Sequence, residues 1–223
     1  MMKHYAVIVA GGAGNRMQTE TPKQFLLLNN LPVLMHTINA FAQSRFHPEI
    51  LLVLSDQQQS YWKSLCLKFD FKVPHRIISG GTERFYSVKN AIDSIADEGI
   101  VAVHDAVRPL ISPKLIDQSF SKAEVLGNVI LAVQSSDSVR LLKDDTSTAL
   151  KRDEIYLVQT PQTFILGILR TAYQQPYRKD FTDDASVVET LGTPINIMEG
   201  ERKNIKVTYP IDLKLAELLI KEK

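Results

Sequence analysis

The feature that most constrains this chain is the alternation of short, wholly apolar runs with longer amphipathic stretches. One such run covers residues 5–10 (Y-A-V-I-V-A) and another covers residues 50–54 (I-L-L-V-L). Strands that are buried on both faces of a parallel sheet have this continuous pattern, whereas strands with one wet face alternate apolar and polar residues. We therefore predict an α/β fold.

The alternation continues as far as residue 133 and predicts the order of the elements. Strands that alternate with amphipathic helices form a doubly wound, mostly parallel sheet with right-handed crossovers. Ligands of such sheets lie outside the carboxyl ends of the strands, so the polar residues there are the candidates for chemistry. We expect strands at 5–10, 50–54, 76–78, 100–103 and 129–133, and helices at 33–44, 57–69, 84–95 and 113–126.

The alternation breaks in the segment 134–156. Residues 139–142 and 149–157 are typical of extended segments on either side of a polar turn at 143–147, which predicts a projecting β-arm. The chain shows neither an internal repeat nor an interdomain linker. We therefore interpret residues 1–223 as a single domain with the arm as an insertion. After the arm we expect helices at 168–173, 184–191 and 210–220, and strands at 195–198 and 204–207.

Composition excludes several classes of protein. The 26 Lys and Arg nearly balance the 25 Asp and Glu, so charge gives no argument for binding nucleic acid or an anionic membrane. The apolar runs are too short to span a bilayer, and no signal peptide is recognisable. The single cysteine, Cys66, excludes an internal disulfide framework and is typical of a small buried side chain. We expect a cytoplasmic protein.

A glycine-rich loop follows the first strand, with the sequence A-G-G-A-G-N-R-M at residues 10–17. Gly11, Gly12 and Gly14 let the backbone approach a ligand and direct N–H groups at phosphate oxygens. Arg16 and Lys23 add two cations, which suits a polyphosphate undergoing displacement at phosphorus. A glycine-rich turn with two solvated cations is the simpler alternative. The spacing fits neither a P-loop nor a dinucleotide-binding fingerprint.

Further polar clusters follow two other predicted strands. Gly81 permits close backbone approach, and Ser87, in the first turn of the next helix, can bind a base; an ordinary glycine turn is the alternative. Asp105 can bind hydroxyls or a metal, and Arg108 can pair with it or bind a phosphate. His104 is typical of a hydrogen-bonded structural histidine rather than a base. No H-E-x-x-H or G-x-S-x-G pattern is present, which argues against a caged transition metal and a serine hydrolase.

The C-terminal third contains a last set of candidates. Thr182 and Asp183 fit helix caps. Lys206 lies in an apolar strand pattern, where a lysine either protects a sheet edge or points into a site. Taken alone, the pattern favours edge protection.

Together these motifs resemble the 2-C-methyl-D-erythritol 4-phosphate cytidylyltransferase family over nearly the whole chain. The resemblance implies a Rossmann-like nucleotidyltransferase fold. It also implies that CTP and methylerythritol phosphate react to give CDP-methylerythritol and pyrophosphate, with Mg²⁺ held mainly by the triphosphate and Asp105 as the candidate protein group beside it. The motifs that carry it are A-G-G-A-G-N-R-M, T-P-K-Q-F, S-G-G-T-E-R, V-H-D-A-V-R-P, Q-T-P-Q-x-F, T-D-D-A-S and E-G-x-x-x-N-I-K-V-T.

The resemblance also implies roles for individual residues. Arg16 and Lys23 match the cations that stabilise the transition state at the α-phosphorus. Lys206 matches a lysine that positions the acceptor phosphate, and this moves its interpretation from edge protection to the site. Arg152 matches an arginine that does the same from the arm of a partner subunit, which implies a homodimer with exchanged arms. The nucleotide-binding positions are Ala10, Gly11, Gly12, Gly14, Gly81 and Ser87, and the acceptor-binding positions are Asp105, Arg108, Ser138 and Thr182.

The chain departs from the family pattern at three positions. Ser138 stands where the family often has threonine, which keeps a hydroxyl and loses a methyl group. Thr82 stands where an acidic residue is common, and Lys203 stands where an acidic or small residue is usual. Two alternatives are ribitol-5-phosphate cytidylyltransferase, which shares the chemistry, and a catalytically silent nucleotide-binding module. The arm and residues 152–156 favour the methylerythritol enzyme over the ribitol enzyme.

Overall fold

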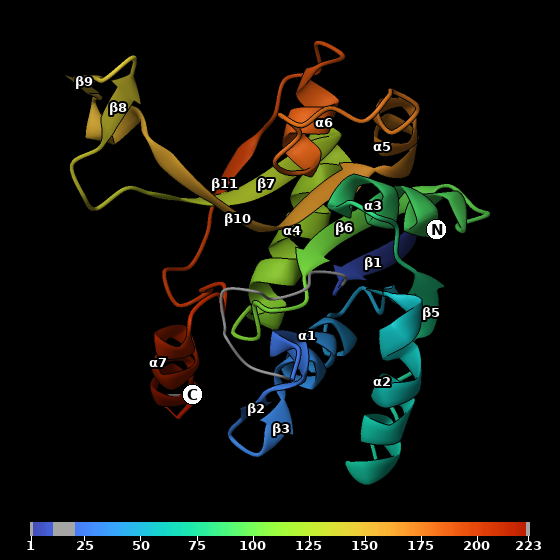
Figure 1. The fold of residues 1–223 in the computed structure, drawn as a ribbon. Coiled ribbons are helices and arrows are strands. Elements are labelled where there is room, and N and C mark those ends of the chain that lie inside the picture. Colours follow the sequence, from blue (N-terminus) through green and yellow to red (C-terminus); the bar gives the residue numbers. More distant parts are fainter. Residues whose placement is uncertain (1, 11–20, 222–223) are drawn as a thin grey trace.

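A computed structural model describes residues 2–10 and 21–221, and it contains the predicted mostly parallel sheet (Figure 1). The strands of this seven-stranded sheet are β1 (Lys3–Val9), β4 (Glu49–Leu54), β5 (Arg76–Ser79), β6 (Gly99–Asp105), β7 (Asn128–Gln134), β10 (Tyr156–Ile165) and β11 (Ile197–Glu199). Their spatial order is β11-β7-β10-β6-β1-β4-β5. All neighbours are parallel except β10, which is antiparallel to both β6 and β7. The doubly wound α/β prediction is confirmed.

Helices cover both faces of the sheet, because alternate side chains of each buried strand point to opposite faces. Ala6 and Ile8 of β1 pack in the cluster that contains the inner sides of three helices, and Tyr5 and Val7 pack in the cluster on the other face. The first group of helices is α1 (Val33–Ala42), α2 (Asp56–Lys68) and α4 (Pro113–Leu126), and the second is α3 (Arg84–Asp93), α5 (Leu166–Ala172) and α6 (Asp184–Glu189). The last helix, α7 (Pro210–Ile220), packs beside a hairpin of β2 (Leu27–Leu28) and β3 (Leu31–Pro32).

Strand β10 is an element that the sequence analysis did not predict. Its sequence, Y-L-V-Q-T-P-Q-T-F-I, carries a proline and four polar residues. The polar side chains are nevertheless buried, because distant groups satisfy them: Gln162 bonds Asp183 (2.8 Å) and the Ala185 N–H (2.9 Å), and Thr163 bonds Ser119 (3.1 Å). The strand register shifts between Gln159 and Gln162, a place where a sheet tolerates proline.

The strand expected at 204–207 is a wrong prediction. This segment is a loop whose Val207 N–H donates to the Val107 carbonyl (2.9 Å), and its Asn204 side chain is fully buried among polar partners. A strand-like apolar pattern here comes from two side chains, Ile205 and Val207, that pack in the cluster of α7 rather than on the sheet.

The predicted arm is present, with its second segment in a different place (Figure 1). An antiparallel pair, β8 (Arg140–Lys143) and β9 (Thr146–Ala149), projects from the sheet, and every residue of the pair is exposed. The chain is extended at β9 and then forms a short 3-10 turn, η3 (Arg152–Glu154), so the extended segment expected at 149–157 is wrong. Positive φ angles at Asp144 (48°) and Asp145 (58°) make the tight hairpin turn.

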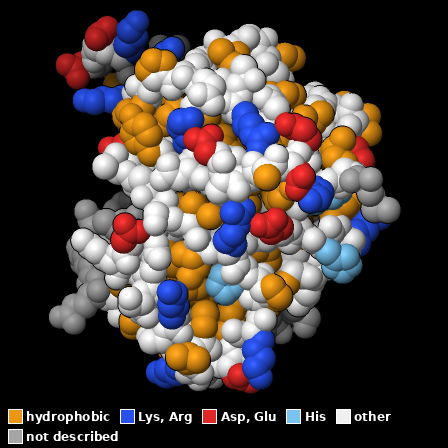
Figure 2. Space-filling model, turned by 90° about the vertical axis from the view of Figure 1, so that its right-hand side faces the viewer, with side chains coloured by type: hydrophobic (Ala, Val, Ile, Leu, Met, Phe, Trp, Pro, Cys, Tyr) orange, Lys and Arg blue, Asp and Glu red, His pale blue; other side chains and the backbone are white. Residues whose placement is uncertain are grey.

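The described surface fits the balanced composition. On the face opposite the arm, basic and acidic side chains are interspersed (Figure 2). Among the described residues, no helix combines the length and the apolar character that crossing a bilayer requires.

A buried ion pair joins α3 to α6. Two guanidinium nitrogens of Arg84 bond the two carboxylate oxygens of Asp184 (2.9 and 2.6 Å), and the Tyr173 hydroxyl donates to the same carboxylate (2.6 Å). Asp184 is fully buried and the Arg84 side chain is 30% exposed. Burial opposes the charge of Arg84, but Asp184 outweighs it and raises the pKa of the guanidinium.

We predict that Asp184→Ala lowers the free energy of unfolding by about 3 kcal/mol, because it leaves a largely buried guanidinium and a buried phenol without their shared acceptor. Urea denaturation measures the loss. The control is Asp93→Ala, which breaks the partly exposed Lys89–Asp93 pair (3.1 Å) and is expected to cost less than about 1 kcal/mol. Equal losses in the two variants would contradict the assignment.

Candidate active site

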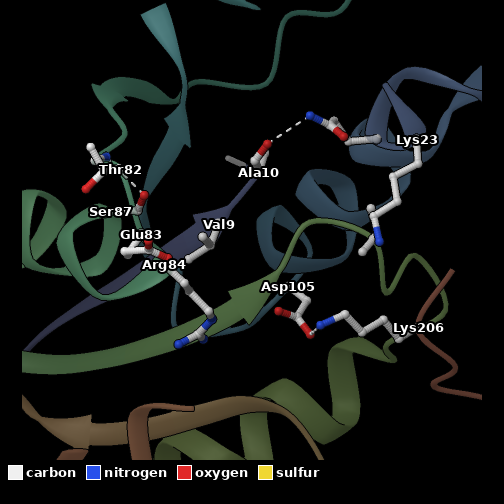
Figure 3. Close-up of a pocket in the computed structure, with 12 residues that line it drawn as sticks. Val9, Ala10, Lys23, Thr82, Glu83, Arg84, Ser87, Asp105 and Lys206 are labelled. Carbon is white, nitrogen blue, oxygen red and sulfur yellow. Dashed lines mark hydrogen bonds and ion pairs between the residues drawn. The ribbon is translucent and has the colours of Figure 1, made fainter. Parts of the chain in front are cut away.

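A pocket of about 360 Å³ lies at the carboxyl ends of β1 and β6, where the fold predicts the ligand. Its walls come from the end of β1, from the 3-10 turn η2 (Lys23–Phe25), from the loop before α3 and from the loop before α7 (Figure 3). The lining residues are Val9, Ala10, Lys23, Gln24, Gly81, Thr82, Glu83, Arg84, Ser87, Asp105, Val107 and Lys206.

Two lysines lie on one side of this pocket (Figure 3). Lys23 extends from η2, and its Nζ donates to the Val207 carbonyl (3.1 Å). Lys206 comes from the neighbouring loop, and its Nζ lies 3.0 Å from Oδ2 of Asp105. Because residues 204–207 are not a strand, edge protection does not explain Lys206, and the side chain is aimed into the pocket instead.

Asp105 is held by cations on two sides. Arg108 Nε lies 3.2 Å from the same Oδ2 that Lys206 contacts, as the sequence pairing of Asp105 with Arg108 suggested. Burial alone would raise the pKa of Asp105, but the charges of Lys206, Arg84 and Arg108 outweigh it and hold the pKa well below its usual range. The carboxylate is therefore ionised throughout the physiological pH range. Burial lowers the pKa of Arg108, whose Nη1 also donates to the Asn204 carbonyl (2.8 Å).

His104 lies beneath the pocket as a structural residue. It is fully buried, with Nδ1 3.0 Å from the Thr160 hydroxyl and Nε2 3.3 Å from the Arg108 carbonyl. The hydroxyl oxygen of Thr160 also accepts a hydrogen bond from the Asp105 N–H (3.0 Å). Burial lowers the pKa of His104 to about 3, so the ring is neutral at physiological pH. It supports the backbone that carries Asp105, in line with the interpretation from sequence.

The opposite side of the pocket is formed by the loop before α3 (Figure 3). Ser87, 2% exposed, accepts a hydrogen bond from the Gly81 N–H on its Oγ (3.1 Å), and its hydroxyl hydrogen remains able to donate. A Cβ on Gly81 would lie 2.3 Å from Cβ of Tyr86, so this position requires glycine. Thr82 lines the pocket next to it. The loop and the first turn of α3 therefore present backbone groups and a hydroxyl at close range.

Four predicted residues do not line the pocket of their own chain, and one of them is Arg108, which is buried and paired with Asp105. Arg152 is on η3 at the base of the arm, 3.7 Å from Asp153, and Ser138 is exposed at the start of the arm. Thr182 is exposed, and its N–H donates to Ser186 Oγ (3.1 Å), while Asp183 caps α6 as predicted. Gly11, Gly12, Gly14 and Arg16 fall outside the described residues.

Several residues that line the pocket were not predicted from the sequence, among them Arg84 and Gln24. Arg84 ends the motif S-G-G-T-E-R, but its partner Asp184 lies 100 positions away, and no local pattern joins them. Gln24 follows Lys23 directly and reads as an ordinary polar residue of a turn. Its 1% exposure is a property of the tertiary structure.

The described residues do not form a cage for a metal ion. Within 2–10 and 21–221, no three His, Cys, Asp or Glu side chains come together as metal ligands do. Asp105 and Glu83 are the acidic residues that line the pocket, and Oδ2 of Asp105 is already engaged by two cations.

Comparisons with known proteins agree on one family. The protein-family model described as "IspD: 2-C-methyl-D-erythritol 4-phosphate cytidylyltransferase" matches residues 4–222 of this chain. A Porphyromonas gingivalis protein named 2-C-methyl-D-erythritol 4-phosphate cytidylyltransferase is 49% identical over 98% of this chain and 98% of its own length. A protein of the same name from Azobacteroides pseudotrichonymphae is 48% identical over 99% of this chain and all of its own.

A solved structure agrees as well. The 4-diphosphocytidyl-2C-methyl-D-erythritol synthase of Anaerococcus prevotii superposes with a TM-score of 0.85, at 25% identity, over 99% of this chain and 96% of that one.

Gly81→Ala is expected to lower the free energy of unfolding by about 1–3 kcal/mol, because the new methyl group overlaps Tyr86 and the loop must move. Thermal or urea denaturation measures this. The matched control, Gly167→Ala, has its nearest contact at 3.9 Å and lies in α5, so it should stabilise by roughly 0.5–1 kcal/mol. The same sign for both variants would contradict the steric argument.

Proposed function

Because this chain belongs to the 2-C-methyl-D-erythritol 4-phosphate cytidylyltransferase family, we propose that it transfers the cytidylyl group of CTP to 2-C-methyl-D-erythritol 4-phosphate. The products are CDP-methylerythritol and pyrophosphate. The observation that carries the proposal is the pocket with Lys23 and Lys206 on one side and, on the other, Gly81 in the loop before α3 and Ser87 in the first turn of α3. The named relatives favour this acceptor over ribitol 5-phosphate, and favour an enzyme over a silent nucleotide-binding module.

The reaction is a displacement at phosphorus. An oxygen of the acceptor phosphate attacks the α-phosphorus of CTP, the bond to the β-phosphate oxygen breaks, and pyrophosphate leaves. Negative charge accumulates on the oxygens around phosphorus, where preorganised cations stabilise it most. We assign this role to Lys23 and Arg16, and assign the positioning of the acceptor phosphate to Lys206.

The other predicted site residues bind the substrates in this proposal. Ala10, Gly81 and Ser87, with Gly11, Gly12 and Gly14, hold the nucleotide. Backbone and hydroxyl groups that lie this close to the base leave too little room for a purine. A base with the wrong hydrogen-bonding pattern would leave these groups of the protein unpaired. Asp105 and Arg108 hold the acceptor together with Ser138 and Thr182.

Mg²⁺ enters this proposal with the nucleotide. The donor set fits an ion that arrives on the triphosphate, because Asp105 offers one carboxylate at the pocket and no protein cage surrounds it within the described residues. Such an ion neutralises phosphate charge. Asp105 would lie beside it.

Incubation with CTP, Mg²⁺ and each of the two polyol phosphates tests the function, with pyrophosphate release as the readout. We predict turnover with methylerythritol phosphate, much less with ribitol 5-phosphate, and little when ATP or GTP replaces CTP. Release with ribitol 5-phosphate alone would identify the rival enzyme. Nucleotide binding without release would identify a silent module.

The arm supports a further part of the proposal, a homodimer with exchanged arms. A two-stranded hairpin is marginal by itself in water, and Leu141 and Leu142 are 52% and 70% exposed. A second copy can cover both arms by two-fold symmetry. Arg152 lies on the arm side, outside its own pocket, and its planar guanidinium suits a phosphate in the partner's pocket. We also propose a cytoplasmic location, which agrees with the unpaired Cys66.

Subunit mixing tests the exchange. We expect Lys23→Ala and Arg152→Ala chains to be nearly inactive alone, and a mixed dimer to have one intact site. Random pairing makes half of the dimers mixed, so about one quarter of wild-type activity returns. A mixture of Lys23→Ala with Lys206→Ala is the control, since both residues act in the same chain and no activity should return. Mixed dimers without activity, or an active monomer, would contradict arm exchange.

A further inference from the structure

We propose that Gln24 is a positioning residue for the transfer reaction, because its side-chain amide fixes the turn that carries Lys23 against the end of β1. The proposal rests on the function proposed above, in which Lys23 stabilises the transition state. Gln24 itself transfers no proton and makes no covalent bond.

The amide of Gln24 is held by two acceptors. Its Nε2 donates to the Ala10 carbonyl (2.8 Å), the contact that the dashed line at Ala10 marks in Figure 3, and to Oε1 of Gln58 on α2 (3.0 Å). A carbonyl only accepts hydrogen bonds, so the NH₂ group, not the oxygen, must face Ala10. The side chain is 1% exposed, so water does not replace either bond readily.

These bonds connect three separate elements at the pocket. Ala10 is fixed on the sheet side by its N–H, which donates to the Val53 carbonyl (2.9 Å). Phe25, next to Gln24, is buried against Tyr61 and Trp62 of α2, with ring centroids at 5.2 and 6.2 Å. The packing of Phe25 holds the turn against α2, and the bond from Gln24 to Ala10 sets the distance between the turn and the end of β1.

This arrangement also fixes the position of Lys23, because the backbone of Lys23 belongs to the same turn. Both Ala10 and Lys23 line the pocket, on the segments that flank residues 11–20. A displacement of about 1 Å at a reacting group can cost roughly 100-fold in rate. The bond from Gln24 to Ala10 therefore places the Lys23 cation relative to Ala10, one of the proposed nucleotide-binding positions, which is a task distinct from binding the nucleotide.

The test compares kinetics with folding. Gln24→Ala is expected to lower kcat about 10- to 100-fold, while KM for CTP changes less than about 3-fold, because transition-state stabilisation is lost rather than ground-state binding. The matched control, Gln59→Ala, is one residue along α2 from Gln58 and bonds Asp56 and Ser79 instead. Its kcat should stay within about 2-fold of wild type, within the range typical of surface substitutions.

A second variant separates positioning from simple loss of packing. Gln24→Glu keeps the size of the side chain but replaces the donor by a carboxyl group, which can donate to Ala10 only when protonated. Burial at a site that is 1% exposed raises the pKa of a carboxyl group above its ordinary value of about 4.3. The kcat of this variant, divided by that of wild type at the same pH, should therefore fall as pH rises through that pKa, in a series from about pH 5 to 9. The nearby charged residues are Lys23 in the same turn, Asp56 at the start of α2, and Asp105 and Lys206 in the pocket. Both proteins carry all four, so the ratio to wild type at each pH reports the substituted side chain.

Amide hydrogen exchange supplies a readout that needs no turnover. Gln24→Ala should speed the exchange of the Phe25 and Leu26 amides, which bond the carbonyls of Pro22 and Lys23 in the turn (2.8 and 3.3 Å). A wild-type protein without activity would refute the proposed function. Amide exchange alone would then test whether Gln24 fixes the turn. An active wild type, with unchanged kcat and exchange in Gln24→Ala, would overturn the positioning role. A lower melting temperature with unchanged kcat would overturn it as well.

Discussion

The rest of the pocket depends on one buried carboxylate, that of Asp105 at the end of the central strand β6. Its Oδ2 accepts from Arg108 and from Lys206, and Arg108 also reaches the Asn204 carbonyl. One residue therefore connects the sheet to the loop that carries Lys206 and, through Val207, to Lys23. Removing a partner from such a buried cluster leaves charge uncompensated, which explains why the sequence places two cations beside one acid.

Where burial follows from local pattern, the sequence predicted the fold closely. The apolar runs located β1, β4, β6 and β7, and the helices α4 and α7 have the predicted bounds. Strand β10 was not predictable in this way, because its buried Gln162 and Thr163 are satisfied by groups on other elements. The segment 204–207 failed for the opposite reason: its apolar residues pack on α7, so an apolar pattern did not indicate a strand.

The candidate site was predictable to the extent that loops follow strands. The sheet brings Lys23, Gly81, Ser87, Asp105 and Lys206 to one pocket, as the carboxyl-end rule requires. Sequence did not reveal the pairing of Arg84 with Asp184 or the contact of Gln24 with Ala10, because a hydrogen bond across the fold leaves no trace in local spacing. The functions of Arg152, Ser138 and Thr182 depend on a partner chain or on ligands, so they stay predictions.

The place of β10 has a consequence for the synthesis of the protein on the ribosome. In the described sheet, β10 joins the group β6-β1-β4-β5 to the pair β7-β11. The first group and β7 are translated before residue 156, but β6 and β7 gain their shared neighbour only when residues 156–165 have left the exit tunnel. Until then each carries an unpaired edge of the kind that recruits foreign strands. The nascent chain is thus most exposed to aggregation just before β10 is complete.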